Sequence, residues 1–134
     1  MLRAMPVLQV RDVVRSRDFY CGKLGFSSHG IWGDNLFCIV QNGPVTIAFQ
    51  KSYTDGPLPL NQYWAAYIYV PDADALHARW KAAGVPITRA PEDMPYGLRE
   101  YDVTDPDGHV IAFGYDPERP GRDPGLLSWP GENG

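Results

Sequence analysis

The 134-residue sequence lacks features that would place it in several large classes of protein. No apolar run approaches the roughly 20 residues that cross a bilayer, so no membrane partner is expected. There is no Lys/Arg-rich stripe and the net charge is −4, which disfavours a nucleic acid as partner because phosphate binding needs clustered basic side chains. The opening MLRAMPVLQV has no apolar signal-peptide core, and a cytoplasmic location is therefore expected.

Cysteine and recognisable nucleophile motifs are also scarce. Cys21 and Cys38 form neither a CxxC pair nor a Cys/His spacing of the kind that binds zinc. Both stand among apolar residues and are expected to be reduced, buried packing residues. No Ser/His/Asp order and no Cys–His motif supplies an activated nucleophile.

One stretch that could hold a metal is better interpreted as a turn. Asp105, Asp107 and His109 alternate around Pro106 and Gly108 in the sequence TDPDGHV. Proline presets φ and glycine accepts a positive φ, so Asp-Pro-Asp-Gly favours a hairpin turn. A calcium loop would need further oxygen ligands and a terminal glutamate, but the residues that follow are apolar.

The chain predicts the same order of elements twice, one strand, one helix and three strands. The first helix is expected to be capped by Asp12 and ended by Gly25, and the second to be capped by Asp72 or Asp74 and ended by Gly84. An α+β fold follows, with one domain over 1–116, modules at 5–50 and 63–116, and a Pro/Gly-rich irregular tail over 117–134. The strands are expected at about 5–10, 26–32, 36–41, 45–50, 64–70, 85–90, 99–104 and 109–115.

The residues that carry a family likeness are Asp12, Ser16, Phe19 and Tyr20, then Leu24-Gly25-Phe26, and the Asp105–Gly108 turn. Together with the repeated element order, they resemble the vicinal-oxygen-chelate superfamily over residues 5–116. That superfamily includes glyoxalase I, extradiol dioxygenases, fosfomycin-modifying enzymes and bleomycin-resistance proteins. The resemblance implies two βαβββ modules that form a curved cleft.

The resemblance also places the metal positions of the family's enzymes, where His, Glu or Gln on four strands hold a divalent ion. The equivalent positions here are Met5, Ala48, Ala65 and Ala112. None offers a nitrogen or a carboxylate oxygen, and such metals need three or four ligands. Gln9 would be a lone ligand, and His109 points away from the Ala112 face. We therefore expect neither a metal nor another cofactor.

Three further stretches look like the metal-free, bleomycin-resistance branch: MPVLQVRDV, WAAYIYVPDADALHARW and PYG. That likeness implies a homodimer, with domain swapping as an option, whose cleft sequesters an unmodified bleomycin-type or planar aromatic antibiotic and so confers resistance. One alternative is a superfamily enzyme (a lyase, isomerase or dioxygenase), which without metal would use Glu100 or Asp102 as general base. Another is a carrier or accessory protein of a biosynthetic pathway, which the sequence does not separate from a resistance protein.

Strand alternation selects the residues that would line the cleft. Tyr67 and Tyr69 share a face and suit a flat ring or a cation, although they could instead pack a dimer interface. Glu100 and Asp102 share a face of their strand and could hold an ammonium group, or remain solvated. Trp129 in the tail could cover the cleft. The full set of expected ligand contacts is Trp32, Phe37, Trp64, Tyr67, Tyr69, Tyr96, Glu100, Asp102 and Ala112.

Overall fold

The computed structural model describes residues 1–125, so Trp129 lies outside the described residues. Within that range the chain forms two four-stranded sheets and two helices, in the order βαβββ–βαβββ. The predicted α+β class and both βαβββ modules are confirmed. Tertiary contacts divide the chain into two compact units, one of Met1–Ala66 with Thr104–Val110 and one of Tyr67–Val103 with the chain from Ile111 onward. No helix among the described residues is long and apolar enough to cross a membrane.

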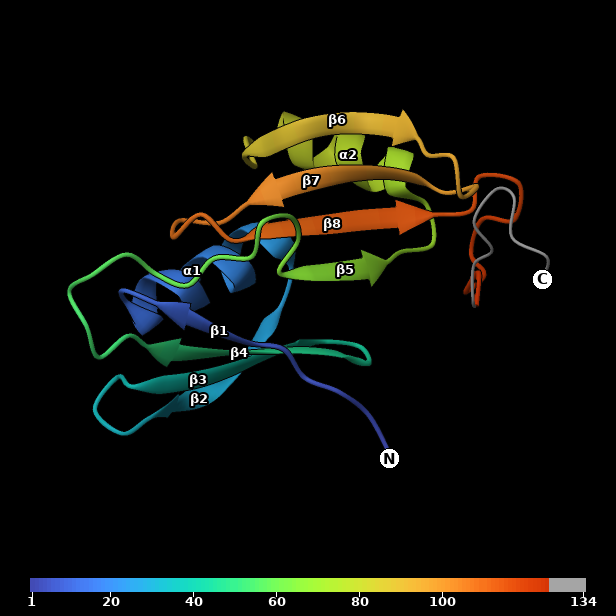
Figure 1. Ribbon diagram of the computed structural model, residues 1–134. Coiled ribbons are helices and arrows are strands. Elements are labelled where there is room, and N and C mark those ends of the chain that lie inside the picture. Colours follow the sequence, from blue (N-terminus) through green and yellow to red (C-terminus); the bar gives the residue numbers. More distant parts are fainter. Residues whose placement is uncertain (126–134) are drawn as a thin grey trace. The chain divides into compact units, whose positions relative to one another are not determined.

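The first unit is a four-stranded sheet with one helix on one face (Figure 1). The strand order is β1-β4-β3-β2, with β1 parallel to β4 and the other pairs antiparallel. Tyr20 of the helix packs its ring 4.7 Å from that of Phe49 and 5.8 Å from that of Phe26, which builds the core. The elements are β1 (Val7–Val10), α1 (Val13–Leu24), β2 (Ser27–Trp32), β3 (Phe37–Asn42) and β4 (Val45–Lys51).

The limits of α1 follow from its capping residues, as the sequence predicts. The Asp12 side chain accepts a hydrogen bond from the Arg15 amide, which satisfies one of the free N–H groups of the first turn. Gly25 ends the helix at φ 78°, a left-handed conformation that glycine adopts without a Cβ clash.

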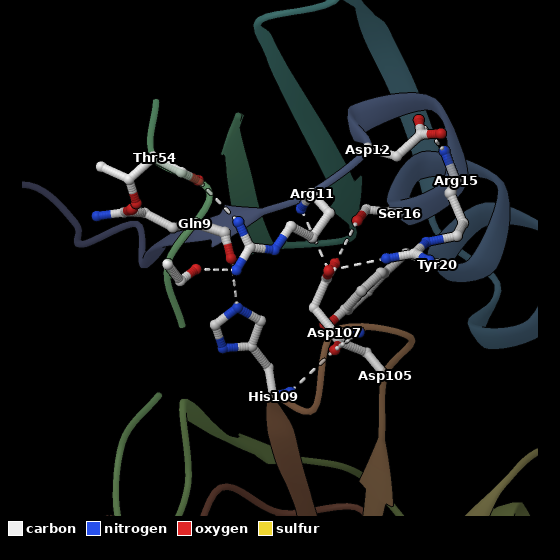
Figure 2. A network of polar contacts seen from close by, with 11 residues as sticks. Gln9, Arg11, Asp12, Arg15, Ser16, Tyr20, Thr54, Asp105, Asp107 and His109 are labelled. Atoms are coloured by element: carbon white, nitrogen blue, oxygen red, sulfur yellow. Dashed lines mark hydrogen bonds and ion pairs between the residues drawn. The ribbon is translucent and has the colours of Figure 1, made fainter. Parts of the chain in front are cut away.

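The Asp105–His109 turn is fixed to β1 and α1 by polar contacts (Figure 2). Asp105 accepts hydrogen bonds from the Tyr20 hydroxyl at 2.9 Å and from the backbone amides of Asp107 and His109. The Arg15 guanidinium donates to Asp107 at 2.8 Å, and His109 Nε2 lies 2.7 Å from the carbonyl of Gln9. The predicted structural turn is found, and its side chains are occupied in positioning it, which the sequence did not indicate.

The second unit is also a four-stranded sheet with a helix on one face (Figure 1). The strand order is β5-β8-β7-β6. Trp80 of the helix makes edge contacts with Tyr101 and Phe113, at ring separations of 6.1 and 4.8 Å. The elements are β5 (Ala66–Tyr69), α2 (Ala73–Ala82), β6 (Ile87–Asp93), β7 (Arg99–Thr104) and β8 (Val110–Tyr115).

Three strands of this unit differ in length from the prediction. β5 and β8 are shorter than expected, and β6 runs to Asp93 rather than ending near Ala90. β6 is an edge strand. Proline has no N–H to donate to a neighbouring strand, so Pro91 is tolerated at this edge. Its pairing with β7 has register shifts on both sides of Arg89, which place Arg89 opposite Asp102 and Glu92 opposite Glu100.

Candidate functional site

The candidate site is the face of the second sheet that turns away from α2. Tyr101 and Phe113 contact the helix, so the side chains of Glu100 and Asp102 point to the other face, because strand side chains alternate. Gly114, next to Phe113, presents its backbone on that same face. Tyr67 joins them, since its hydroxyl donates to Glu100 Oε1 at 3.1 Å. The predicted sharing of one face by tyrosine and carboxylate is therefore found.

Gly114 makes this contact across the sheet sterically feasible. β8 lies between β5 and β7, so the Tyr67 side chain must pass over β8 to reach Glu100. A Cβ at Gly114 would lie 1.8 Å from the Tyr67 hydroxyl oxygen and 2.7 Å from the ring carbon that bears it. The missing side chain thus leaves space for the tyrosine.

Glu100 is fully buried, and its carboxylate accepts hydrogen bonds from three side chains. Tyr67 and Tyr96 both donate their hydroxyls to Oε1, and Arg89 Nη2 donates to Oε2 at 2.6 Å. A buried carboxylate without partners would be very costly, so these contacts allow a charged glutamate in this sheet. Tyr96 comes from the Met94–Gly97 turn between β6 and β7, which a backbone hydrogen bond from Gly97 to Met94 closes.

Arg89 is the member of this cluster that the sequence analysis missed. Its Nε and Nη2 atoms bind the two oxygens of Asp102, each at 2.9 Å, and Nη1 lies 3.3 Å from Glu92. The sequence signal that could have found it is an arginine in the strand expected at 85–90, which directly precedes the strand at 99–104 that carries Glu100 and Asp102. The register shifts on both sides of Arg89, which bring it to Asp102, had no clear sequence signal.

The electrostatics of the cluster keep both tyrosines protonated and the arginine charged. Burial, reinforced by the nearby Glu100 carboxylate, raises the pKa of Tyr67, and burial together with the hydrogen bond to Glu100 raises the pKa of Tyr96. Hydrogen bonding to Asp102 raises the pKa of Arg89 further above its high ordinary value. Three carboxylates around one guanidinium give the cluster a formal charge of −2.

Tyr69 extends the aromatic surface beyond this cluster. Its ring centroid lies 5.0 Å from that of Tyr67, and 46% of the residue is exposed. An exposed ring next to a negatively charged cluster can take a flat ring or a cation on its face. Ala112 lies on the same face of β8 as Gly114 and is fully buried.

The remaining predicted residues belong to the first unit. Trp32 pairs with Phe37 across β2 and β3, with ring centroids 6.1 Å apart, and Trp32 is 46% exposed. Trp64 lies just before β5, where its carbonyl accepts a hydrogen bond from the Asn61 side chain. The structure thus groups Tyr67, Tyr69, Tyr96, Glu100, Asp102 and Ala112 in one unit, and Trp32, Phe37 and Trp64 in the other.

The residues at the family's metal positions do not fit a divalent ion. Ala48 and Ala112 are fully buried methyl side chains, Ala65 adds another methyl, and Met5 has only a thioether. Among residues 1–125, no group of three or more His, Cys, Asp and Glu side chains is arranged to hold a metal. The absence of a bound metal therefore stays a prediction.

The repeated βαβββ order, with a helix on one face of each sheet, defines a class of paired-module α+β proteins. Residues 3–113 match the family described as the Glyoxalase/Bleomycin resistance protein/Dioxygenase superfamily, and the chain belongs to it. The predicted family is confirmed.

Relatives in this family point to its bleomycin-resistance branch. A bleomycin resistance protein of Geobacillus stearothermophilus is 27% identical over 129 residues, covering 84% of this chain and 96% of that protein. The bleomycin-binding protein of bleomycin-producing Streptomyces verticillus, solved with copper(II)-bleomycin, is 29% identical with a TM-score of 0.67, covering 84% of this chain and 94% of that one. A bleomycin resistance determinant encoded on the transposon Tn5 shares the fold at 24% identity and a TM-score of 0.69, covering 86% and 98%.

Proposed function

We propose that the protein binds a bleomycin-type or planar aromatic antibiotic without changing it, and thereby confers resistance by sequestration. The observation that carries the proposal is the tyrosine pair, with Tyr67 partly buried and Tyr69 exposed, beside a cluster of net negative charge. Aromatic faces bind flat rings and cations, and a negative cluster attracts a cationic ligand. The similarity to proteins named for bleomycin resistance and bleomycin binding supports the same choice of ligand.

In this proposal the ligand occupies a cleft at a homodimer interface in the cytoplasm, and neither metal nor cofactor takes part. Domain swapping is one way for the partner chain to complete the cleft. Glu100 and Asp102 act through Arg89, because their oxygens already accept its N–H groups. Of the nine residues predicted from the sequence, those proposed to contact the ligand are Trp32, Phe37, Trp64, Tyr67, Tyr69 and Tyr96. The other three, Glu100, Asp102 and Ala112, are proposed to shape the site from beneath, because Glu100 and Ala112 are fully buried and Asp102 is paired with Arg89.

Isothermal titration of the purified protein with bleomycin, followed by size-exclusion chromatography, tests the proposal. We expect saturable binding at a fixed ratio of drug to chain, by a dimer. The double variant Trp32→Ala/Tyr69→Ala should bind at least about tenfold more weakly, since aromatic contacts of this kind carry more than 1 kcal/mol each. No heat of binding for bleomycin would refute a bleomycin-type ligand, and a panel of planar aromatic antibiotics would then test the rest of the proposal.

A further inference from the structure

The chain continues after β8 into a segment that lies beyond the family match, which ends at residue 113. Residues 116–125, here called the C-terminal segment, are described and belong to the second unit. Asp116 fixes its first turn by accepting hydrogen bonds from the Glu118 amide and the Arg119 side chain. The Gly121 amide donates to the carbonyl of Pro71 at 2.8 Å, which attaches the segment next to the end of β5.

The C-terminal segment forms a wall of two pockets, each of which includes a tyrosine of the proposed site. The larger, about 410 Å³, is lined by Tyr96 and Leu98, among others, and by the segment residues Pro117, Arg119 and Pro124. In Figure 1 the red segment lies beside the turn that joins β6 to β7. The smaller pocket, about 200 Å³, is lined by Tyr69, Val70, Pro71, Gly121, Arg122 and Asp123.

The smaller pocket combines an aromatic face, two apolar side chains and an arginine side chain. Tyr69 offers a ring that is 46% exposed, and Val70 and Pro71 add apolar surface. Within residues 1–125, the Arg122 guanidinium has no hydrogen-bond or ion-pair partner. A cavity of roughly 150 Å³ is enough for a benzene ring, so a pocket of about 200 Å³ accepts one ring with a small substituent.

We infer that this pocket holds one flat aromatic ring that carries a hydrogen-bond acceptor, with the ring against Tyr69 and the acceptor bound by Arg122. The C-terminal segment is then a selectivity element of the site. The inference rests on the proposed binding function, which it refines by naming the chemistry of one end of the ligand. An arginine fork suits a carbonyl or amide oxygen at the ring edge, because its donors are planar and always charged.

The direct test uses the full-length, ¹⁵N-labelled protein with benzamide as the probe and toluene as the matched ring without an acceptor. Benzamide should shift the backbone amides of Val70, Gly121, Arg122 and Asp123 in NMR spectra. Arg122→Ala should weaken the binding of benzamide about tenfold, the lower end of the effect of losing a hydrogen bond to a charged group, and should leave the binding of toluene unchanged. Arg79→Ala, on α2, is the control of the same residue type.

Thermal unfolding of Arg122→Ala should match that of the wild type, because the Arg122 side chain supports no other described residue. The inference is overturned if benzamide shifts none of the four amides, or if Arg122→Ala binds it as the wild type does. A bleomycin titration separates this failure from failure of the proposed function. If the protein binds bleomycin but benzamide shifts none of the four amides, only the inference is refuted. If it binds benzamide but not bleomycin, only the choice of bleomycin is refuted.

Discussion

Arg89 binds both carboxylates on the face of β7 that turns away from α2, with Nη2 2.6 Å from Glu100 and Nε 2.9 Å from Asp102. Glu100 is fully buried, so Arg89 supplies the charge that makes its ionised form tolerable in the sheet. Because Tyr67 and Tyr96 donate to the same glutamate, the orientation of both rings depends on this ion pair.

Replacing Arg89 by methionine should therefore destabilise the fold. We expect the free energy of unfolding, measured by urea denaturation, to fall by about 3–5 kcal/mol, the cost of leaving a buried carboxylate unpaired. The double variant Arg89→Met/Glu100→Gln should recover part of the loss, since the uncompensated charge is then gone. Arg79→Met is the exposed control. A loss in Arg89→Met no larger than in the control would show that the pair contributes nothing to stability.

Adding a methyl group at Gly114 should displace Tyr67 from Glu100. The new Cβ would overlap the Tyr67 hydroxyl at 1.8 Å, and we expect Gly114→Ala to cost about 1–3 kcal/mol of unfolding free energy. In the double variant Gly114→Ala/Tyr67→Ala the tyrosine side chain that the new Cβ would meet is gone. Its unfolding free energy should therefore be nearly that of Tyr67→Ala alone. Gly22→Ala in α1, where nothing lies within 4 Å of the new Cβ, should be neutral or stabilising. Equal effects at the two glycines would contradict the placement of Tyr67.

These contacts show how far the sequence alone reaches. Capping residues such as Asp12 and Gly25 and the Asp105–Gly108 turn are local signals, and the structure follows them closely. The Arg89 cluster is not local, because it depends on register shifts in the pairing of β6 with β7 and on a glycine in a third strand. Glu100 was therefore expected to have a free carboxylate, whereas its oxygens are already paired.

The stability of the second unit should depend on pH through Asp74. Burial alone would raise the pKa of Asp74, but hydrogen bonds from Tyr115 and Arg99 outweigh it and lower the pKa below 3.8. A pKa lowered by folding means that the carboxylate stabilises the protein above about pH 4 and loses this effect as the pH falls through the folded-state value.

Asp74→Asn should accordingly cost about 1 kcal/mol of unfolding free energy at neutral pH, a value kept small because the side chain is 41% exposed. The difference in unfolding free energy from the wild type should shrink toward zero at about pH 2. Asp55→Asn, at an exposed position between β4 and β5, should show no such trend. A constant difference across this range in urea denaturation would mean that Asp74 acts through packing and not through its charge.

Tyr69 should contribute to binding through its ring and not through its hydroxyl. Tyr69→Ala should lower the affinity for bleomycin by about tenfold, as expected for an aromatic contact worth about 1–1.5 kcal/mol. Tyr69→Phe should bind bleomycin like the wild type. Tyr53→Ala removes an exposed tyrosine between β4 and β5 and serves as the control. Unchanged affinity in Tyr69→Ala, measured by isothermal titration, would remove Tyr69 from the site.

The central claim is that the protein holds a drug without changing it. The most direct measurement is to saturate the purified protein with bleomycin, incubate the complex for hours, denature it, and identify the released drug by mass spectrometry. The account predicts that unmodified bleomycin is recovered in a fixed ratio to the chain, with no gain of product over time. Bleomycin recovered in altered form, in amounts that exceed the protein, would contradict sequestration and identify the protein as an enzyme of its superfamily.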